Sequence, residues 1–558
     1  VEPCPDYRRF AYTIDVDGSE RFEIRVREIE GGAELPDRVP GTNGVMAWAR
    51  DGESFLYLRL DESLRPSSVW RHRLGTPAEE DAPVYEERDP GFMVSLDQPL
   101  DESLIFIEAG DHETSEVRFV PADRPDAEPV LIAERREGHQ YSADHRDGTL
   151  YILTDDTHEN RRIVTAPLAA PGPENWQEMI APSDAVYLSG LLVFTDFMVV
   201  TEREDAVQHV RVRRFSDGDN HRIAFEEPAY SVHPRGNAEP GQRHIRLGFQ
   251  SLVTPPTVLD YDMETRQRTV RKVQEIPSGY DASAYVSERA WAEAPDGEKV
   301  PVTIVRRRDT PKDGSAPLYL YAYGSYGATI DPYFSPNRLS LLDRGWVWAL
   351  AHPRGGSDLG RRWYNQGKLA HKVNTFTDVI AVGRHLAAEG YTTEGRLTVA
   401  GGSAGGLMVG ACVNMAPDLF RAAAAHVPFV DVLNTMLDDT LWLTPSEFVE
   451  WGNPIADREA YFRIKGYSPY DNVEAKRYPH LFITGGISDP RVTYWEPAKW
   501  VARLRANKTD DNLLVLRMNM GAGHGGASGR YDSLKELAEE YAFLLMVYGM
   551  TGDEAAAG

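Results

Sequence analysis

The chain has 558 residues, which is too long for one hydrophobic core and predicts two or three domains. Its hydrophobic content of 42% is typical of a globular protein, and no run of about eighteen apolar residues predicts a membrane-spanning helix. The formal net charge of −26 argues against a nucleic-acid-binding protein, which needs a basic face. Only Cys4 and Cys412 are cysteines, and no Cys/His cluster accompanies them. We therefore expect no disulfide framework, no metal and no cofactor, and a cytoplasmic location.

Short strand-like runs recur through the first half of the chain at a nearly constant spacing. They begin at Phe10, Leu56, Ile105, Tyr151, Val199 and Ile245. Successive starts are 46, 49, 46, 48 and 46 residues apart. An all-β repeat of this length is typical of β-propeller blades, whereas a sandwich of hairpins rarely keeps so regular a step. The spacing predicts a β-propeller domain over residues 1–275 with six visible repeats.

The second half alternates strands with helices, which predicts a mostly parallel sheet. A linker-like segment, Pro277-Ser278-Gly279-Tyr280, separates it from the repeats. The expected strands cover residues 302–305, 318–321, 346–350, 481–484 and 513–516, and the expected helices cover residues 376–388 and 534–545. We assign residues 276–558 to an α/β-hydrolase domain.

One turn in this domain carries the pattern of a catalytic serine. An apolar run ends at Gly401-Gly402-Ser403-Ala404-Gly405-Gly406, and a helix-compatible run then extends to Pro417. A strand, a glycine-flanked serine and a helix form the context in which G-x-S-x-G indicates a nucleophile elbow. The glycines leave room for a sharp turn, and the helix start directs free N–H groups toward an oxyanion. The alternative is a glycine-rich βα turn with an incidental serine.

The chain order of the α/β-hydrolase fold predicts the partners of Ser403. In this fold the acid and the histidine follow the serine, each on a loop after a later strand. Asp489 follows the run at 481–484, and His524 follows the run at 513–516. We predict that His524 is the general base and that Asp489 orients it.

Several further motifs closely resemble those of oligopeptidase B, a branch of the prolyl oligopeptidase family of serine peptidases. The motifs are GGSAGG, VPFVDVLNTMLD (Val427–Asp438), EFVEWGNP (Glu447–Pro454), SPYDN (Ser468–Asn472), YWEPAKWVARLR (Tyr494–Arg505) and GHGGASGR (Gly523–Arg530). The resemblance is dense from about residue 318 to 545 and looser through the repeats. It implies a serine endopeptidase that cleaves short peptides after Arg or Lys, with a propeller that excludes larger substrates.

The resemblance also implies roles for residues that their own context leaves undecided. Tyr323 matches a tyrosine that donates to the oxyanion beside the backbone N–H of Ala404. Glu447 matches the carboxylate that binds the P1 cation, and Phe429 matches an aromatic residue that stacks on the same side chain. Arg491 matches an arginine that holds substrate carbonyls.

The sequence departs from the family pattern at a few positions. Asp331 matches an acid of the S2 subsite, but Tyr333 replaces a second acid, and Val449 stands where relatives often carry another. The resemblance further implies seven blades and an N-terminal extension. Because only six repeats are visible, we expect an N-terminal segment with the extension and the remaining blade to be a partner of this chain.

Other functions remain open on the sequence alone. A prolyl-cleaving relative would need an apolar P1 pocket, which Glu447 disfavours. An aminopeptidase would need an acidic clamp for a free N-terminus on the propeller. A catalytically impaired scaffold that binds peptides without cutting them is the alternative from another class, and the intact set of Ser403, Asp489 and His524 argues against it.

Overall fold

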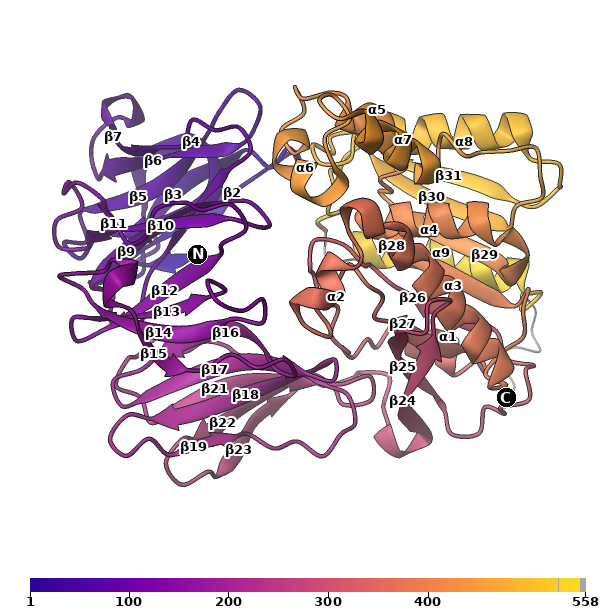
Figure 1. Cartoon of the computed structure of the whole chain (residues 1–558), viewed down its shortest axis with the longest axis horizontal. Helices are drawn as coiled ribbons and strands as arrows, with labels where there is room; N and C mark the ends of the chain where they lie inside the picture. Colours follow the sequence, from indigo (N-terminus) through magenta and orange to yellow (C-terminus); the bar gives the residue numbers. More distant parts are fainter. Residues whose placement is uncertain (530, 552–558) are drawn as a thin grey trace.

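The computed structural model describes residues 1–529 and 531–551, which form two parts that lie side by side (Figure 1). The first part contains only antiparallel sheets, and the second contains a mixed sheet covered by helices. No helix among the described residues is long and apolar enough to span a membrane. The predicted fold, an α/β-hydrolase domain joined to a β-propeller, is confirmed.

Six four-strand units make up the propeller within the described residues, and the predicted repeat is correct. Each predicted run lies on the second strand of its unit. The first unit contains β1 (Glu2–Pro3), β2 (Arg9–Ile14), β3 (Phe22–Glu28) and the first part of β4 (Glu34–Trp48), and the second contains the rest of β4 with β5 (Ser54–Leu60), β6 (Pro66–Arg73) and β7 (Ala82–Glu86). The third contains β8 (Met93–Asp97), β9 (Leu104–Gly110), β10 (Ser115–Pro121) and β11 (Val130–Leu131), and the fourth contains β12 (Tyr141–Arg146), β13 (Thr149–Thr154), β14 (Arg162–Pro167) and β15 (Gln177–Ile180). The fifth contains β16 (Tyr187–Val193), β17 (Phe197–Glu204), β18 (Val207–Arg214) and β19 (Asn220–Arg222), and the sixth contains β20 (Ser231–Pro234), β21 (His244–Gln250), β22 (Thr257–Asp262) and β23 (Arg268–Val273).

The first two units are joined into one seven-stranded sheet by the long strand β4. Its beginning pairs with β3, and its end pairs with β5. Gly41 and Gly44 lie between these parts with φ values of +71° and +89°. Glycine adopts this backbone conformation without steric cost, so the strand can turn from one blade toward the next without ending.

Alternating side chains of the second strands hold neighbouring units together. In β5, Phe55 and Tyr57 pack with apolar residues of the first unit, whereas Leu56 and Leu58 pack with those of the third. Successive residues of a strand point to opposite faces, so each blade contributes to two interblade cores. This packing explains why the strongest repeat signal lies on these strands.

The second part is built on an eight-stranded sheet with the order β24-β25-β27-β26-β28-β29-β30-β31. The pairings β24–β25 and β25–β27 are antiparallel, and all others are parallel. The strands are β24 (Tyr285–Glu293), β25 (Lys299–Arg307), β26 (Leu318–Tyr321), β27 (Val347–Ala351), β28 (Leu397–Gly402), β29 (Phe420–His426), β30 (His480–Gly486) and β31 (Leu514–Asn519). All five strand runs predicted for this domain coincide with strands of this sheet.

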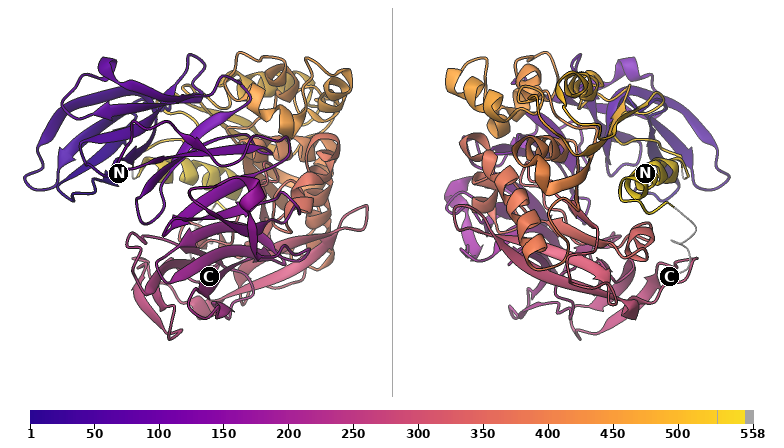
Figure 2. Two further views of the ribbon diagram at one scale, coloured as in Figure 1. Left: turned by 60° about the vertical axis from the view of Figure 1, so that its left-hand side comes forward. Right: turned by 90° about the vertical axis from the view of Figure 1, so that its right-hand side faces the viewer.

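Helices cover both faces of this sheet and complete two hydrophobic cores. Residues of α3, α4 and α8 share one core, and residues of α1 and α9 share the other. The helices are α1 (Leu339–Leu342), α2 (Arg361–Asn365), α3 (Val373–Ala388), α4 (Ala404–Met415), α5 (Val432–Met436), α6 (Thr444–Trp451), α7 (Arg458–Tyr467), α8 (Trp495–Asn507) and α9 (Asp532–Val547). Figures 1 and 2 show the propeller packed against one side of this α/β part, with α2 and α6 facing it in Figure 1.

The segment that joins the two parts contains a short 3-10 helix, η3 (Ala282–Ala284). Strand β23 ends at Val273, and β24 begins at Tyr285. The predicted domain boundary at residues 275 and 276 falls in this segment.

Candidate active site

Ser403 lies in a sharp turn between β28 and α4, and its backbone has a φ of +56° and a ψ of −122°. A serine rarely adopts this conformation, so the surrounding structure must impose it. A Cβ on Gly401 would lie 2.5 Å from the Gly405 carbonyl oxygen, and a Cβ on Gly406 would lie 2.4 Å from Pro428 Cβ. The glycines are therefore required by close backbone approach, as the sequence predicted.

The acid and the histidine follow β30 and β31, and the structure brings them together. Asp489 Oδ2 lies 2.7 Å from His524 Nδ1. The other carboxylate oxygen of Asp489 accepts hydrogen bonds from the backbone N–H groups of Arg491 and Val492, at 2.9 and 3.0 Å. Asp489 is thus buried, fixed by its own loop, and able to hold His524 in one tautomer.

Ser403 and His524 line the same cavity, whose volume is about 370 Å³. No hydrogen bond joins their side chains among the residues that the structure describes. Catalytic hydrogen bonds are often long without a substrate and tighten when it binds. The structure therefore brings Ser403 and His524 to one cavity and joins His524 to Asp489, which is compatible with the predicted triad.

Tyr323 follows β26 and lines this cavity together with Ser403. Burial raises the pKa of the Tyr323 phenol, and the nearby charges of Glu447 and Glu450 raise it further. The hydroxyl consequently stays protonated and available as a donor at neutral pH. The N–H of Ala404 at the start of α4 has no acceptor within the described part of the chain. Tyr323 and the Ala404 N–H thus both lie close to Ser403, as an oxyanion hole would need.

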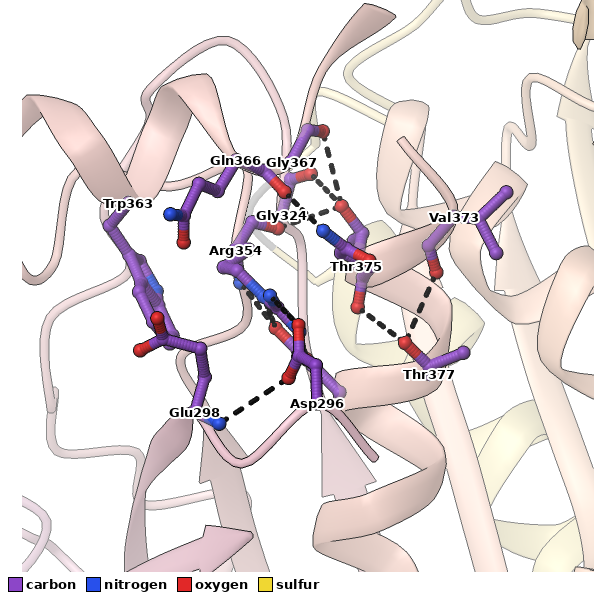
Figure 3. A network of polar contacts seen from close by, with 12 residues as sticks. Asp296, Glu298, Gly324, Arg354, Trp363, Gln366, Gly367, Val373, Thr375 and Thr377 are labelled. Atoms are coloured by element: carbon purple, nitrogen blue, oxygen red, sulfur yellow. Dashed lines mark hydrogen bonds and ion pairs between the residues drawn. The ribbon is translucent and has the colours of Figure 1, made fainter. Parts of the chain in front are cut away.

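Hydrogen bonds from α3 and from Lys372, which precedes this helix, hold the turn that carries Tyr323. The carbonyl oxygen of Gly324 accepts hydrogen bonds from Lys372 Nζ at 2.7 Å and Thr375 Oγ1 at 3.3 Å. Thr375 also bonds to the carbonyl oxygens of Arg354 and Gly367, as Figure 3 shows. The buried guanidinium of Arg354 is itself paired with Asp296 and Asp378.

Glu447 is a buried residue of α6 that lines the same cavity. Its Oε2 accepts hydrogen bonds from Tyr326 Oη at 3.0 Å and from Trp451 Nε1 at 2.6 Å. None of the described residues bonds to its Oε1. Burial raises the pKa of Glu447 to about 7, and the charge of Glu450 contributes in the same direction. A buried carboxylate with one free oxygen is suited to bind a cationic side chain.

Aromatic rings form the walls around Glu447. Phe429 is buried, lines the cavity and packs against Trp451 with a centroid distance of 5.4 Å. Tyr326 packs edge-on against the same indole at 5.5 Å. These rings can receive the aliphatic stem and the flat face of a guanidinium. The structure thus brings Glu447 and Phe429 together in the cavity that contains Ser403.

Two predicted residues are engaged by the propeller. Arg491 lines the cavity, and its Nε and Nη2 pair with the carboxylate of Glu20 on the turn between β2 and β3. Asp331 pairs with Arg203 of β17 at 2.8 Å and does not line the cavity that contains Ser403. The structure thus brings Arg491 to the site but places Asp331 in the interface between the two parts.

Some residues that line the cavity were not predicted from the sequence. Tyr326 lies two residues after Gly324, and its φ of +61° is a strained value that its glycine-rich context could have indicated. Met93 and His112 come from the propeller and line the cavity beside Tyr326 and Glu447. No local pattern identifies them, because they reach the site only through packing of the two parts.

A serine in a strained strand–helix turn and a histidine oriented by a buried acid, on the loops of an α/β-hydrolase sheet, are features of a serine hydrolase. Family models agree with this class: "Prolyl oligopeptidase family" matches residues 332–551, and "Prolyl oligopeptidase, N-terminal beta-propeller domain" matches residues 1–274. The chain belongs to the prolyl oligopeptidase family of serine peptidases.

Its similar relatives include dipeptidyl aminopeptidase BI from Pseudoxanthomonas mexicana, which is 44% identical over 98% of this chain and 76% of that protein. Protease 2 from Moraxella lacunata is 42% identical over 98% of this chain and 79% of its own.

Oligopeptidase B from Leishmania major superposes with a TM-score of 0.95 at 37% identity, covering 99% of this chain and 79% of that one. The closed form of oligopeptidase B from Trypanosoma brucei, with covalently bound antipain, has a TM-score of 0.94 at 38% identity, covering 98% of this chain and 78% of that one. The resemblance to oligopeptidase B is therefore confirmed.

Proposed function

We propose that this chain is a serine oligopeptidase that hydrolyses short peptides on the carboxyl side of Arg or Lys. The observation that carries the proposal is Glu447, a buried carboxylate with one oxygen that no described residue bonds, in the cavity that Ser403 also lines. A P1 cation would satisfy this oxygen, whereas a neutral P1 residue would leave it desolvated and unpaired. Such a site can discriminate against the wrong side chain by several orders of magnitude.

The proposed reaction passes through an acyl-enzyme. Ser403 Oγ attacks the scissile carbonyl while His524 Nε2 accepts its proton, and Tyr323 and the Ala404 N–H bind the oxyanion. The tetrahedral intermediate collapses as His524 returns the proton to the leaving amine. Water, activated by the same histidine, then attacks the ester and releases the acid. Asp489 stabilises the imidazolium in both steps.

The test is hydrolysis of N-blocked peptide amides that differ only at P1, with Arg, Lys, Pro or Phe there. We expect Arg and Lys substrates to be cleaved with the highest kcat/KM, and Ser403→Ala to reduce kcat by about five to six orders of magnitude. Preference for Pro would contradict the proposal in favour of a prolyl-cleaving member. Absence of cleavage, with no labelling of Ser403 by a fluorophosphonate, would favour a catalytically impaired scaffold.

A second candidate is release of dipeptides from a free N-terminus, which the name of the Pseudoxanthomonas relative suggests. The observation that favours it is the Glu20 carboxylate, which the propeller presents beside Arg491. If Arg491 binds the P2 carbonyl, a free P2 ammonium would lie within reach of Glu20. Matched P1-Arg dipeptide amides with free and acetylated N-termini separate the candidates: a large advantage of the free form, lost in Glu20→Gln, would establish the exopeptidase.

Short basic peptides are the proposed partners. The chain spans roughly three quarters of the length of the relatives described above. The cytoplasmic location also belongs to this proposal.

A further inference from the structure

A propeller loop completes the pocket around Glu447. The loop connects β9 to β10, and its residue His112 lines the same cavity as Ser403 and Glu447. The imidazole packs on the ring of Tyr326 with a centroid distance of 5.0 Å and an interplanar angle of 32°. Since Tyr326 donates to Glu447, His112 is separated from the pocket carboxylate by a single side chain.

The α/β part fixes the position of this loop. Glu113 Oε1 pairs with Arg361 Nη2 at 2.6 Å and with the ammonium of Lys368. The same Arg361 Nη2 donates to the carbonyl oxygen of His112 at 3.1 Å. Arg361 and Lys368 are both nearly buried, so these contacts are shielded from solvent and well defined. These contacts with the α/β part therefore fix the position of His112 in the cavity.

The pocket needs an additional acceptor if its ligand is a guanidinium. Glu447 Oε2 already receives two hydrogen bonds, which leaves Oε1 for the ligand. A guanidinium carries five N–H donors in a rigid plane, so one oxygen cannot satisfy it. The ring nitrogens of His112 form no hydrogen bond with any residue in the described ranges. Burial lowers the pKa of His112, which keeps the imidazole neutral and one ring nitrogen able to accept.

We propose that His112 is a specificity-determining residue of the P1 pocket, where it accepts a hydrogen bond from the guanidinium of a P1 arginine. Glu113, through its pairing with Arg361 and Lys368, is the positioning residue for this contact. The inference deepens the proposed function and depends on it, since it concerns the choice between Arg and Lys at P1. The lysine side chain is one bond shorter than the arginine side chain, and its compact ammonium binds Glu447 alone.

The test compares His112→Phe with the unmodified chain. Phenylalanine keeps a ring that can pack on Tyr326 but offers no acceptor. We expect kcat/KM for a P1-Arg amide to fall by about ten- to a hundredfold, mainly through KM, because a hydrogen bond to a charged group is lost far from the reacting carbonyl. P1-Lys and P1-Phe amides should change by less than about threefold. His112→Ala also removes the acceptor but adds no phenyl ring. It should therefore show the same selective loss of P1-Arg cleavage, which excludes an effect of the phenyl ring itself.

Glu113→Gln tests the positioning role. It should lower the Arg-to-Lys ratio in the same direction and by a smaller factor, because the loop loses its ion pairs but keeps the His112 side chain. Two matched changes, His244→Phe and Glu178→Gln, remove the same residue types at exposed propeller positions that form ion pairs only within the propeller. They should leave the ratio unchanged.

The rate at which a fluorophosphonate labels Ser403 provides a readout that does not depend on P1. It should be the same in all of these variants. Equal losses for Arg and Lys substrates in His112→Phe, or a parallel loss of labelling, would overturn the inference and leave His112 as an interdomain contact only. A parent chain that cleaves Phe or Pro amides better than Arg and Lys amides would instead overturn the proposed function.

Discussion

Arg491 and Glu20 form a bidentate ion pair that joins the catalytic loop to the propeller. The two shortest contacts, from Arg491 Nε and Nη2, are 2.8 and 2.7 Å long. Beside this pair, a Cβ on Gly18 would lie 2.8 Å from the backbone nitrogen of Gly523. The turn between β2 and β3 therefore packs directly on the loop that carries His524. We therefore expect this contact to couple the packing of the two parts to the order of the loop that carries His524.

Removal of the Glu20 charge should loosen this contact. Glu20→Gln leaves Arg491 without its ionic partner, so the guanidinium is no longer oriented toward the substrate backbone. Because the pair is partly exposed, we expect a modest effect, with KM for blocked P1-Arg peptides raised about fivefold and kcat little changed. Hydrogen exchange should increase in residues 15–20 and 521–526. Glu23→Gln, which breaks a pair with Arg25 inside the propeller, is the control. Unchanged exchange in both segments would refute the coupling.

The pH dependence of P1 selectivity should report the ionisation of Glu447. Burial raises its pKa to about 7, so the unoccupied pocket holds an increasingly neutral carboxylic acid below that pH. A P1 cation favours the ionised form. The kcat/KM ratio of P1-Arg to P1-Phe substrates should therefore be highest above about pH 7 and fall up to tenfold per pH unit below it. Taking the ratio cancels the titration of the triad, which both substrates share.

Glu447→Gln provides the control for this pH dependence. The amide keeps the shape of the pocket but cannot ionise, so the ratio should be low and flat across the same pH range. We expect kcat/KM for the P1-Arg substrate to fall by at least about a hundredfold at pH 8, the usual cost of leaving a buried charge unpaired. A steep profile that persists in this variant would assign the ionisation to another group.

Tyr323→Phe should reduce catalysis without weakening substrate binding. The phenol is placed to donate to the oxyanion, which exists only along the reaction path, so its loss should appear in kcat. Loss of one such donor typically costs a factor of about a hundred to a thousand. Steady-state kinetics on the P1-Arg amide measure this directly. Tyr7→Phe, a change at an exposed tyrosine of the propeller outside the Ser403 cavity, should have little effect. A rise in KM with unchanged kcat would place Tyr323 among the binding residues instead.

Much of the catalytic geometry could be predicted because it depends on local order along the chain. Carboxyl ends of parallel strands meet at one edge of a sheet, so Ser403, Asp489 and His524 had to lie near each other once the strands were found. The steps near 46 residues were visible because the second strand of each unit carries a short run rich in buried or partly buried apolar residues. Both features leave a regular pattern in the sequence.

The remaining features depend on how two independently patterned parts pack together. His112 and Arg361 are 249 residues apart, and neither position has a distinctive neighbourhood. For the same reason Asp331 was predicted beside the substrate, whereas the structure pairs it with Arg203 across the interface. The shared strand β4 was also missed, since the turn signals at Gly41 and Gly44 suggest an end to the strand rather than its continuation between blades.

Two glycine substitutions should separate the steric demand of the nucleophile elbow from general helix stability. Gly406 lies in α4, and a Cβ there would meet Pro428 Cα at 2.5 Å, which a rigid proline backbone cannot relieve. Gly466 lies near the end of α7, is exposed, and has no atom within 4 Å of its Cβ position. Both positions are helical, so alanine improves the intrinsic helix propensity of each. Their difference therefore isolates the clash.

We expect Gly466→Ala to raise the free energy of unfolding by a few tenths to about 1 kcal/mol and to leave kinetics unchanged. Gly406→Ala should lower it by about 1–3 kcal/mol, because overpacking forces the backbone to move. The shift would displace Ser403, so kcat should fall by up to about a hundredfold even where the variant is fully folded. Calorimetric Tm values and fluorophosphonate titration of Ser403 measure the two effects separately. Full activity and an increased Tm in Gly406→Ala would mean that the elbow is held by something other than this close approach.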